Sequence, residues 1–264
     1  MPTASFFVGI DVGAARTKVA VLDAERTLIG RAVRKSGTDF AVSAQTCLEA
    51  ALQAARLNNI DIEYAVSTGY GRRNVAAAQE TKTEISCHAR GCYHCFPMAA
   101  TIIDIGGQDN KVIKLDSAGR RSSFKMNRKC AAGTGAFLEE MSVRLDIPLN
   151  RMNRLAREST RSVELGSYCT VFSATEVLEK IRQGCEVPDI VKALFLSIIK
   201  RVMEMEPWTA RVVVTGGVVA HNPILAEMMT EISDREVLVP EHPQFTGAIG
   251  AALFAMDGRR SGHG

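Results

Sequence analysis

The sequence predicts an α/β protein that is built from two related halves. The main observation is a repeat: Phe6–Asp23 reads FFVGIDVGAARTKVAVLD, and Ala99–Asp116 reads AATIIDIGGQDNKVIKLD. A shift of 93 residues aligns the two stretches without a gap and places Asp11 on Asp104. Each copy contains an apolar strand, an Asp-x-Gly turn and a second strand rich in β-branched residues, a pattern typical of a β-hairpin. A chain of 264 residues, 46% of them hydrophobic, is long enough for two lobes with a core each.

Composition argues against two classes of function. The net charge is +3 and the Lys and Arg residues are scattered, so the sequence does not predict nucleic-acid binding. The one dense basic run, from Arg120 to Lys129, is interpreted as a solvated loop, with a docking patch for an acidic partner as the alternative. No segment approaches the ~20 apolar residues of a membrane helix. The stretch Met1–Gly13 lacks the basic start of a secretion signal. We therefore expect a cytoplasmic protein that does not act on a membrane.

The chain contains seven cysteines, an odd number that favours thiols, metal ligands or a metal cluster over disulfides in a reducing compartment. Cys92 and Cys95 form a Cys-x-x-Cys sequence. Such a pair is either a redox pair, half of a metal site, or two structural thiols. We favour structural thiols, because no second Cys-x-x-Cys exists to complete a zinc site.

The turns of the repeated hairpin suit a phosphate and a magnesium ion. Glycine lets backbone N–H groups approach phosphate oxygens, and a carboxylate at the end of a buried strand suits Mg²⁺. Two such turns that face each other would hold one polyphosphate from both sides. The alternative is two hairpins whose Asp and Gly only shape the turns. The candidate binding residues are Asp11, Gly13, Ala14, Ala15, Arg16 and Lys18 in the first turn and Asp104, Gly106 and Gly107 in the second.

Within these turns we expect Asp11 to be the first magnesium-associated carboxylate and Asp104 the second, acting through water. Asp109 or Gln108 is expected to orient the attacking water, as a positioned polar group does in other phosphoryl transfers. The sequence does not choose between these two. Lys18 either reaches a phosphate or flanks its strand, and the repeat places a second lysine at the same position.

A third glycine turn follows in RVVVTGGVVAH, where a buried strand ends at Gly216 and Gly217. The dipeptide Asn222–Pro223 predicts the N-cap of a following helix, with proline in its first turn. A turn of this kind would let the backbone lie against an adenosine. Near the end of the sequence, Gly247–Met256 reads GAIGAALFAM and predicts a helix of small residues that packs closely beneath the turns.

Two cysteines precede predicted helices, in the segments MNRKCAAGTG and SYCTVFSATE. Ser173 and Glu176 fit a capping box for the second of these helices, and Thr170 is a competing N-cap. Cys130 and Cys169 therefore lie just before or at helix N-termini, where N–H groups and the helix dipole stabilise anionic ligands. An iron–sulfur cluster takes four thiolates, so two cysteines would need a matching pair from a related partner. The alternative is that both are inert core residues.

The three glycine turns, in this order, resemble the superfamily of acetate and sugar kinases, heat-shock protein 70 and actin. The resemblance implies a duplicated ribonuclease-H-like fold, the actin-like ATPase fold, with two lobes around a nucleotide cleft. It implies that the first turn holds one phosphate group, the second turn the others and the third the adenosine. The expected lobes are residues 1–95 and 96–264, with a cluster-ligand segment at 126–185 and the helix 245–258 as a candidate to join the first lobe. There is no Gly-x-x-x-x-Gly-Lys-Ser/Thr sequence, so a P-loop NTPase is excluded.

Eight motifs are similar to one family within this superfamily: GIDVGAARTK, STGYGRR, EISCHARG, DIGGQDNKVI, KMNRKCAAGTGAFLE, CTVFSATEV, VVVTGGVV and TGAIGAALF. Together they resemble the ATP-dependent activators of 2-hydroxyacyl-CoA dehydratases and the small ATPase subunits of benzoyl-CoA reductases. The resemblance implies that Cys130 and Cys169 bind one 4Fe-4S cluster between two subunits, with Gly133 and Gly135 also among the cofactor-binding residues. His88, in EISCHARG, is interpreted as a buried, hydrogen-bonded histidine near the hinge rather than a ligand.

The resemblance also implies ATP with Mg²⁺ as the nucleotide and a homodimer, or a heterodimer with a homologous ATPase subunit. It implies ferredoxin or flavodoxin as the electron donor and a reductase or dehydratase of a CoA ester as the acceptor. ATP hydrolysis would change the lobe arrangement, and the electron would leave at a lower potential. The Cys-x-x-Cys pair departs from the activator pattern and makes us favour a subunit of benzoyl-CoA reductase over a homodimeric dehydratase activator. A small-molecule kinase, or a nucleotide-gated chaperone or filament protein, is more distant, since each would leave Cys130 and Cys169 without a role.

Overall fold

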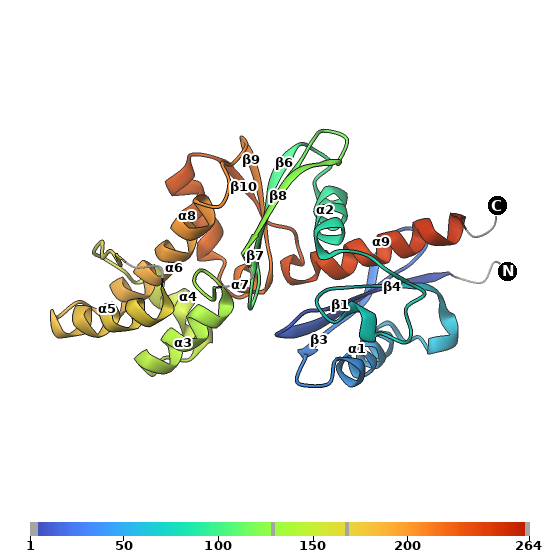
Figure 1. The fold of residues 1–264 in the computed structure, drawn as a ribbon, viewed down its shortest axis with the longest axis horizontal. Helices are drawn as coiled ribbons and strands as arrows, with labels where there is room; N and C mark the ends of the chain where they lie inside the picture. Colours follow the sequence, from blue (N-terminus) through green and yellow to red (C-terminus); the bar gives the residue numbers. More distant parts are fainter. Residues whose placement is uncertain (1–4, 128–129, 167–168, 262–264) are drawn as a thin grey trace. The chain divides into compact units, whose positions relative to one another are not determined.

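The two repeated hairpins lie at the centres of two separate five-stranded sheets (Figure 1). This computed structural model describes residues 5–127, 130–166 and 169–261. The chain forms two compact units. The first unit contains Met1–Met98, Ser117–Arg120 and Gln244–Gly264, and the second contains Ala99–Asp116 and Arg121–Pro243. Neither unit is a continuous segment, because the first unit takes in both ends of the chain.

The sheet of the first unit has the order β3-β2-β1-β4-β5. Its strands are β1 (Phe6–Val12), β2 (Arg16–Leu22), β3 (Leu28–Lys35), β4 (Ile62–Thr68) and β5 (Glu80–Thr81). The strands β1, β2 and β3 pair antiparallel, whereas β4 runs parallel to β1. The register places Asp11 opposite Lys18 on one side and Thr68 on the other. The end of β1 therefore lies where the hairpin turn and the end of β4 meet.

Helices cover both faces of this sheet. One face packs on α1 (Phe40–Ala55), whose N-cap Asp39 accepts a hydrogen bond from the N–H of Val42 at 3.0 Å. The other face packs on α9 (Thr246–Ser261), which also lies against α2 (Glu84–Cys95). Short 3₁₀ turns lie at Asn59–Asp61 and Arg72–Asn74. Because both faces are covered, nearly every residue of β1 is buried, as expected for a strand with apolar side chains on both sides.

The sheet of the second unit has the order β10-β9-β6-β7-β8. Its strands are β6 (Ala100–Ile105), β7 (Asn110–Leu115), β8 (Arg121–Asn127), β9 (Arg211–Thr215) and β10 (Glu236–Leu238). The strand β8 corrects the interpretation of the basic run as a solvated loop. Residues 121–127 pair antiparallel with β7, and the strand lies at the edge of the sheet with Arg121 and Lys125 exposed. The last two basic residues of the run, Arg128 and Lys129, lie outside the described residues.

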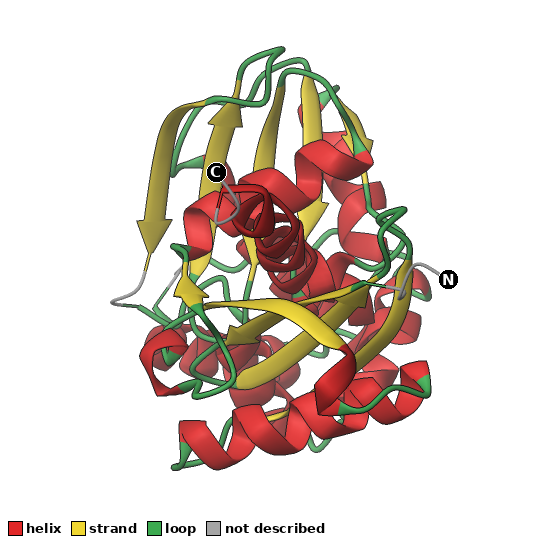
Figure 2. Ribbon diagram, turned by 90° about the vertical axis from the view of Figure 1, so that its right-hand side faces the viewer, coloured by secondary structure: helices red, strands yellow, loops and turns green. Residues whose placement is uncertain are grey.

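The helices of the second unit build one continuous core against β6, β7 and β9. They are α3 (Gly135–Leu145), α4 (Leu149–Arg157), α5 (Thr170–Arg182), α6 (Val187–Met203), α7 (Gly217–His221) and α8 (Ile224–Ser233). A 3₁₀ turn, Pro243–Phe245, precedes α9. Figure 2 shows the same elements coloured by type, with the strands in yellow and the helices in red. None of the described helices has the length and apolar character that crossing a bilayer requires.

A buried carboxylate fixes the loop that precedes the second cysteine segment. Asp189, in the first turn of α6, accepts hydrogen bonds from the N–H groups of Thr160 and Arg161 at 2.9 Å each and from the hydroxyl of Ser159 at 2.8 Å. The hydrogen bond from the Arg161 N–H is the main reason that the pKa of Asp189 lies below its usual value.

Candidate functional site

The first hairpin turn joins β1 to β2 and holds a buried carboxylate at its base. Asp11 is 4% exposed and accepts a hydrogen bond from the Lys18 ammonium at 3.0 Å. The turn is closed by a hydrogen bond from the Gly13 N–H to the Arg16 carbonyl at 3.1 Å. The hydroxyl of Ser36, the residue after β3, donates to the Gly13 carbonyl at 2.6 Å and helps to fix the turn.

The remaining predicted residues of this turn lie nearer the surface. Ala14 and Arg16 are exposed, and Ala15 is half-buried. The N–H of Ser36 donates to the Ala15 carbonyl at 3.1 Å. All six predicted residues of the first turn therefore lie within the β1–β2 hairpin, with the Asp11–Lys18 ion pair at the base of its turn.

The second hairpin turn, between β6 and β7, repeats this geometry and adds a second acid. The N–H of Gly106 donates to the Asp109 carbonyl at 2.9 Å, which closes the turn. The ammonium of Lys111 pairs with Asp104 at 2.9 Å and with Asp109 at 2.8 Å. Asp104 and Lys111 are each 3% exposed. Gln108 lies between these groups in the sequence but is exposed at the tip of the turn.

The third glycine turn lies directly beside the second. Asp104 and Thr215 are opposite each other in the parallel pair β6–β9. Gly216, which follows, has φ +103°, and a β-carbon there would lie 2.7 Å from Asp104 Oδ1 and 2.3 Å from the Ile105 carbonyl oxygen. Only glycine fits such a conformation at such a distance. The structure therefore brings Gly216 and Gly217 of the predicted adenosine turn to Asp104.

The first unit contains a counterpart of this third turn that we did not predict. Thr68 lies opposite Asp11 in the parallel pair β1–β4, and Gly69 follows with φ +91°. A β-carbon on Gly69 would lie 2.7 Å from Asp11 Oδ1 and 2.4 Å from the Val12 carbonyl oxygen. The shared signal in the sequence is a Thr-Gly pair after a buried strand, in STGYG and in VTGGV. Each unit thus places a carboxylate, a lysine and a Thr-Gly turn together.

The two candidate cluster cysteines lie in the second unit. Cys130 is half-buried and precedes α3 by five residues, and Cys169 is exposed and is the N-cap residue of α5. Both predicted starts of this helix are wrong: Thr170 is the first residue of α5 rather than its N-cap, and the capping-box residue Ser173 lies inside the helix. The Glu176 carboxylate instead accepts a hydrogen bond from the N–H of Gly166 at 2.8 Å.

The segment after Cys130 is hydrogen-bonded to the second glycine turn. At the start of α3, the N–H of Gly135 donates to the Gly106 carbonyl at 2.9 Å, and the N–H of Ala136 donates to the Gly107 carbonyl at 2.8 Å. The two predicted glycines of CAAGTG, Gly133 and Gly135, therefore lie against the second turn.

Two asparagines extend these connections toward the cysteine. The side-chain amide of Asn110 donates to the Gly133 carbonyl at 2.8 Å, and that of Asn127 donates to the Cys130 carbonyl at 3.1 Å. Asn110 is the first residue of β7 and Asn127 the last residue of β8. Both strand ends therefore fix the backbone between Cys130 and α3.

The other cysteines lie in different surroundings. Cys47 and Cys87 are buried, and burial raises the pKa of the Cys47 thiol to about 11 and that of Cys87 to about 12. Cys92 is buried and Cys95 exposed, both in the last turn of α2. Among the described residues, no group of three or more His, Cys, Asp or Glu side chains is placed to hold a metal ion.

His88 confirms the expectation of a buried, hydrogen-bonded histidine. It is 7% exposed on α2, and its Nδ1 lies 3.3 Å from the Thr246 hydroxyl oxygen.

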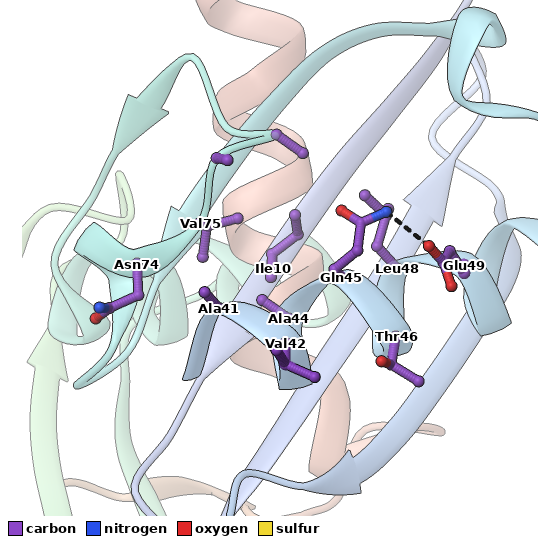
Figure 3. A pocket seen from close by; sticks show the side chains of 12 residues that line it. Ile10, Ala41, Val42, Ala44, Gln45, Thr46, Leu48, Glu49, Asn74 and Val75 are labelled. Carbon is purple, nitrogen blue, oxygen red and sulfur yellow. Dashed lines mark hydrogen bonds between the residues drawn. The ribbon is translucent and has the colours of Figure 1, made fainter. Parts of the chain in front are cut away.

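A pocket of about 370 Å³ lies elsewhere on the first unit, between α1 and residues 74–77 (Figure 3). Its lining is mainly aliphatic, with Ile10, Ala44 and Val75 among the residues that face it. At its rim, the Gln45 amide donates to Glu49 at 2.8 Å. It contains none of the predicted site residues, and its aliphatic lining does not suit a polyphosphate.

Known proteins resemble this chain over nearly its whole length. A model of the BadF/BadG/BcrA/BcrD ATPase family matches residues 8–255. The activator of lactoyl-CoA dehydratase from Anaerotignum propionicum is 40% identical over 96% of this chain and 98% of its own length. The activator of 2-hydroxyisocaproyl-CoA dehydratase from Clostridium difficile, solved with bound ADPNP, superimposes with a TM-score of 0.91 at 36% identity, over 98% of this chain and 97% of that one. This match confirms the predicted α/β fold of the actin-like ATPase type.

The benzoyl-CoA reductase interpretation is not favoured. One of the subunits of benzoyl-CoA reductase from Thauera aromatica is 28% identical over 93% of this chain and 91% of its own length, well below the activators. The Cys-x-x-Cys pair on which that interpretation depended lies in the last turn of α2.

Proposed function

This chain belongs to the BadF/BadG/BcrA/BcrD ATPase family, and we propose that within it the protein activates a 2-hydroxyacyl-CoA dehydratase. On this proposal it hydrolyses MgATP and uses the hydrolysis to drive an electron, at low potential, into the dehydratase. The greater similarity to dehydratase activators than to the reductase protein supports the acceptor.

The observation that carries the proposal is the pair of hydrogen bonds between the second glycine turn and the start of α3. Through them, Gly106 and Gly107 are joined to the helix that follows Cys130. A change in this turn on nucleotide binding would shift the first residues of α3 and the cysteine segment with them. An electron-transfer protein controlled by ATP needs such a connection, whereas a kinase does not.

Each unit offers groups that fit a magnesium nucleotide. Asp11 and Asp104 are buried carboxylates at strand ends, and carboxylate oxygens are the ligands that Mg²⁺ prefers. Each is paired with a lysine, a side chain that binds phosphate as a point charge. We assign the glycine turns to the phosphates and the turn at Gly216 to the adenosine. The metal would supply charge neutralisation at the phosphates, and the chain's own residues would orient it.

For the attacking water, we propose Gln108 rather than Asp109. The Asp109 carboxylate is already bound by the Lys111 ammonium at 2.8 Å, which fixes its orientation. Gln108 is exposed at the tip of the same turn, and its neutral amide both donates and accepts hydrogen bonds. Asp109 then serves to hold Lys111 in place.

We assign the cluster to Cys130 and Cys169. Cys169 is the N-cap residue of α5, where the helix dipole stabilises a thiolate, and Cys130 lies five residues before α3. A 4Fe-4S cluster takes four thiolates, so two copies of this chain with two cysteines each would complete it. The bound cluster would supply one-electron chemistry. A ferredoxin or flavodoxin is the proposed donor, and a homodimer is favoured over a pair of unequal subunits.

The proposal is tested by anaerobic purification of the full chain and of three variants. The wild type is expected to be brown, to bind about two iron atoms per chain and to elute as a dimer. Cys130→Ser and Cys169→Ser should lose the colour and the iron, whereas Cys95→Ser, an exposed cysteine on α2, should keep both. Wild-type protein that is colourless after anaerobic reconstitution, with full ATPase activity, would overturn the cluster assignment.

The acceptor is tested separately. Addition of a purified 2-hydroxyacyl-CoA dehydratase, with a reduced ferredoxin and MgATP, should give dehydration that stops when ATP is replaced by ADPNP. Transfer to benzoyl-CoA reductase in preference to the dehydratase would show that the acceptor is wrong.

A further inference from the structure

The motif EISCHARG places a buried histidine beside the first candidate magnesium carboxylate. His88 Nε2 lies 3.1 Å, and Asp11 Oδ2 3.2 Å, from the position that a β-carbon on Gly247 would occupy. The two side chains therefore approach the same point next to the first turn of α9. All of these groups are well shielded: Asp11 is 4% exposed, His88 7% and Thr246 fully buried.

The other ring nitrogen of His88, Nδ1, contacts a hydroxyl group that fixes the ring. His88 Nδ1 lies 3.3 Å from the hydroxyl oxygen of Thr246. In the tautomer in which Nδ1 accepts from that hydroxyl, the hydrogen is on Nε2, the nitrogen that approaches the same point as Asp11. A hydrogen-bond donor beside a carboxylate fixes the orientation of that carboxylate. Residues arranged in this way orient a metal ligand without touching the metal themselves.

The same residues lie where two helices make their closest approach. A β-carbon on Gly91 of α2 would lie 2.1 Å from the Thr246 carbonyl oxygen, and one on Gly250 of α9 would lie 1.8 Å from the Cys87 carbonyl oxygen. Backbone therefore meets backbone on both sides of His88. The chain first leaves the first unit at Met98, shortly after α2, and enters it for the last time at Gln244, shortly before α9. The His88–Thr246 contact thus joins the two helices next to these crossings.

Lys18, the other partner of Asp11, is a different kind of group. Its side chain is 19% exposed, and a phosphate would compete with Asp11 for its ammonium. His88 is buried and anchored on Thr246, so it keeps its place when the lysine moves.

We propose that His88 is a positioning residue of the ATPase. It holds the Asp11 carboxylate in the orientation that the metal requires and, through Thr246, links that carboxylate to the crossing of α2 and α9. This inference rests on the role proposed for Asp11. It gives the EISCHARG motif a role of its own, separate from those proposed for the glycine turns and the cluster cysteines.

The test uses the full chain with substitutions at both members of the contact. His88→Ala and His88→Leu remove the N–H donor, and Thr246→Val removes the hydroxyl at nearly constant shape, whereas Thr246→Ser keeps it. His94→Gln, an exposed histidine on the same helix, is the matched control. ATPase rates are measured over a magnesium titration. Nucleotide affinity is measured with a fluorescent ATP analogue, and hydrogen exchange of residues 246–250 without nucleotide.

His88→Ala should raise the magnesium concentration for half-maximal rate about tenfold, the usual effect of losing a group that orients a metal ligand. Thr246→Val should raise this magnesium concentration by a smaller factor, and Thr246→Ser should leave it at the wild-type value. Affinity for the nucleotide without magnesium should stay unchanged, and exchange at 246–250 should rise in His88→Ala and Thr246→Val. His94→Gln should match the wild type throughout. A purely structural role would instead lower the melting temperature without changing the magnesium requirement.

The outcomes separate this inference from the proposed function. If Asp11→Asn is fully active, the role of Asp11 is wrong and the inference falls with it. If Asp11→Asn is inactive while His88→Leu and Thr246→Val keep the wild-type magnesium requirement, only the inference is overturned. These two milder variants decide the question if His88→Ala does not fold.

Discussion

The hairpin turns of the two units share a register but differ in how they neutralise their carboxylate. In the first, Asp11 has one lysine, 19% exposed, and lies near His88. In the second, Asp104 shares the buried Lys111 with Asp109. The Thr-Gly turn beside each carboxylate is the same, with left-handed glycines at nearly equal distances. The shared Thr-Gly turn packs against the carboxylate at the strand end in both units. The partners of the carboxylate differ, so each turn contacts different neighbours.

Those connections lead to different elements. The first turn is next to the α2–α9 crossing, and the second is hydrogen-bonded to α3, which follows Cys130. A duplication that kept the two turns equivalent would not produce this difference. The added groups therefore give each turn a different set of neighbouring elements within its own unit.

Substitution of the two lysines is expected to give the largest difference between the two turns. Lys111→Met leaves the buried Asp104 carboxylate without its partner and should lower the free energy of unfolding by about 3–5 kcal/mol. Lys18→Met should cost about 1–3 kcal/mol, because the pair it breaks is closer to solvent. Urea unfolding, followed by the fluorescence of Trp208, the single tryptophan, and by circular dichroism, measures both. Lys114→Met is the control: Lys114 lies on the same strand as Lys111 and forms a partly buried ion pair with Glu206. Equal losses at Lys18 and Lys111 would contradict the difference in burial.

The Thr-Gly turns test what the two units share. Gly69→Ala and Gly216→Ala should each destabilise the protein by about 3 kcal/mol, because both combine a left-handed φ with a close backbone contact. Thermal unfolding measures the loss. Gly37→Ala and Gly184→Ala have a left-handed φ but open space around the β-carbon, and should cost only about 1–2 kcal/mol. A large loss at only one of the two turns would show that they are not equivalent.

The tip of the second turn tests the choice of water-orienting group. Gln108→Ala should lower kcat at least about tenfold with little change in KM, since it removes a contact made in the transition state. Asp109→Asn should have a smaller effect on kcat and a larger one on stability, because it weakens the Lys111 pair. Steady-state ATPase assays resolve the two effects, with Gln53→Ala on α1 as the control. The opposite order would assign the water to Asp109.

The smallest of these effects is expected from acid. Low pH should destabilise the second unit through Asp189. Its folded-state pKa is lowered, mainly by the hydrogen bond from the Arg161 N–H. The stabilisation is therefore complete above the ordinary aspartate pKa of about 4 and is lost as the pH falls through the lower folded-state value. Asp189→Asn should reduce stability at neutral pH and make the Trp208 signal less sensitive to acid in this range. Glu231→Gln, an exposed carboxyl on α8, should leave the acid response unchanged.

The sequence predicted the parts of the site that depend on local pattern. The gap-free repeat located both hairpins and predicted that the two lysines are equivalent, because a turn of fixed length sets the register across it. It missed Thr68–Gly69 because the spacing from carboxylate to Thr-Gly differs between the units. The second unit has α3, α4, α5 and α6 between β8 and β9, so no constant shift aligns the two Thr-Gly pairs.

Errors arose where short polar segments allow more than one solution. Asn222 was expected to cap α8, but it follows the five-residue α7 and donates to the Val218 carbonyl at 2.9 Å. The N–H of Ile224 is instead bonded to the Asn153 side chain at 3.1 Å, a residue from α4 that no local pattern reveals. The contact between α3 and the second glycine turn also depends on tertiary packing. The motifs alone gave no sign of it.

The position of α9 has a consequence for how the protein is made. This helix covers one face of the first sheet, and its small residues complete the core around Phe7, Ala20 and Val66. The ribosome synthesises β1 before every strand of the second unit and α9 after all of them. One apolar face of the first sheet therefore stays uncovered while the rest of the chain emerges, and this unit finishes folding after translation of its neighbour. Nascent chains that stop before α9 should be bound by chaperones that recognise exposed apolar surface.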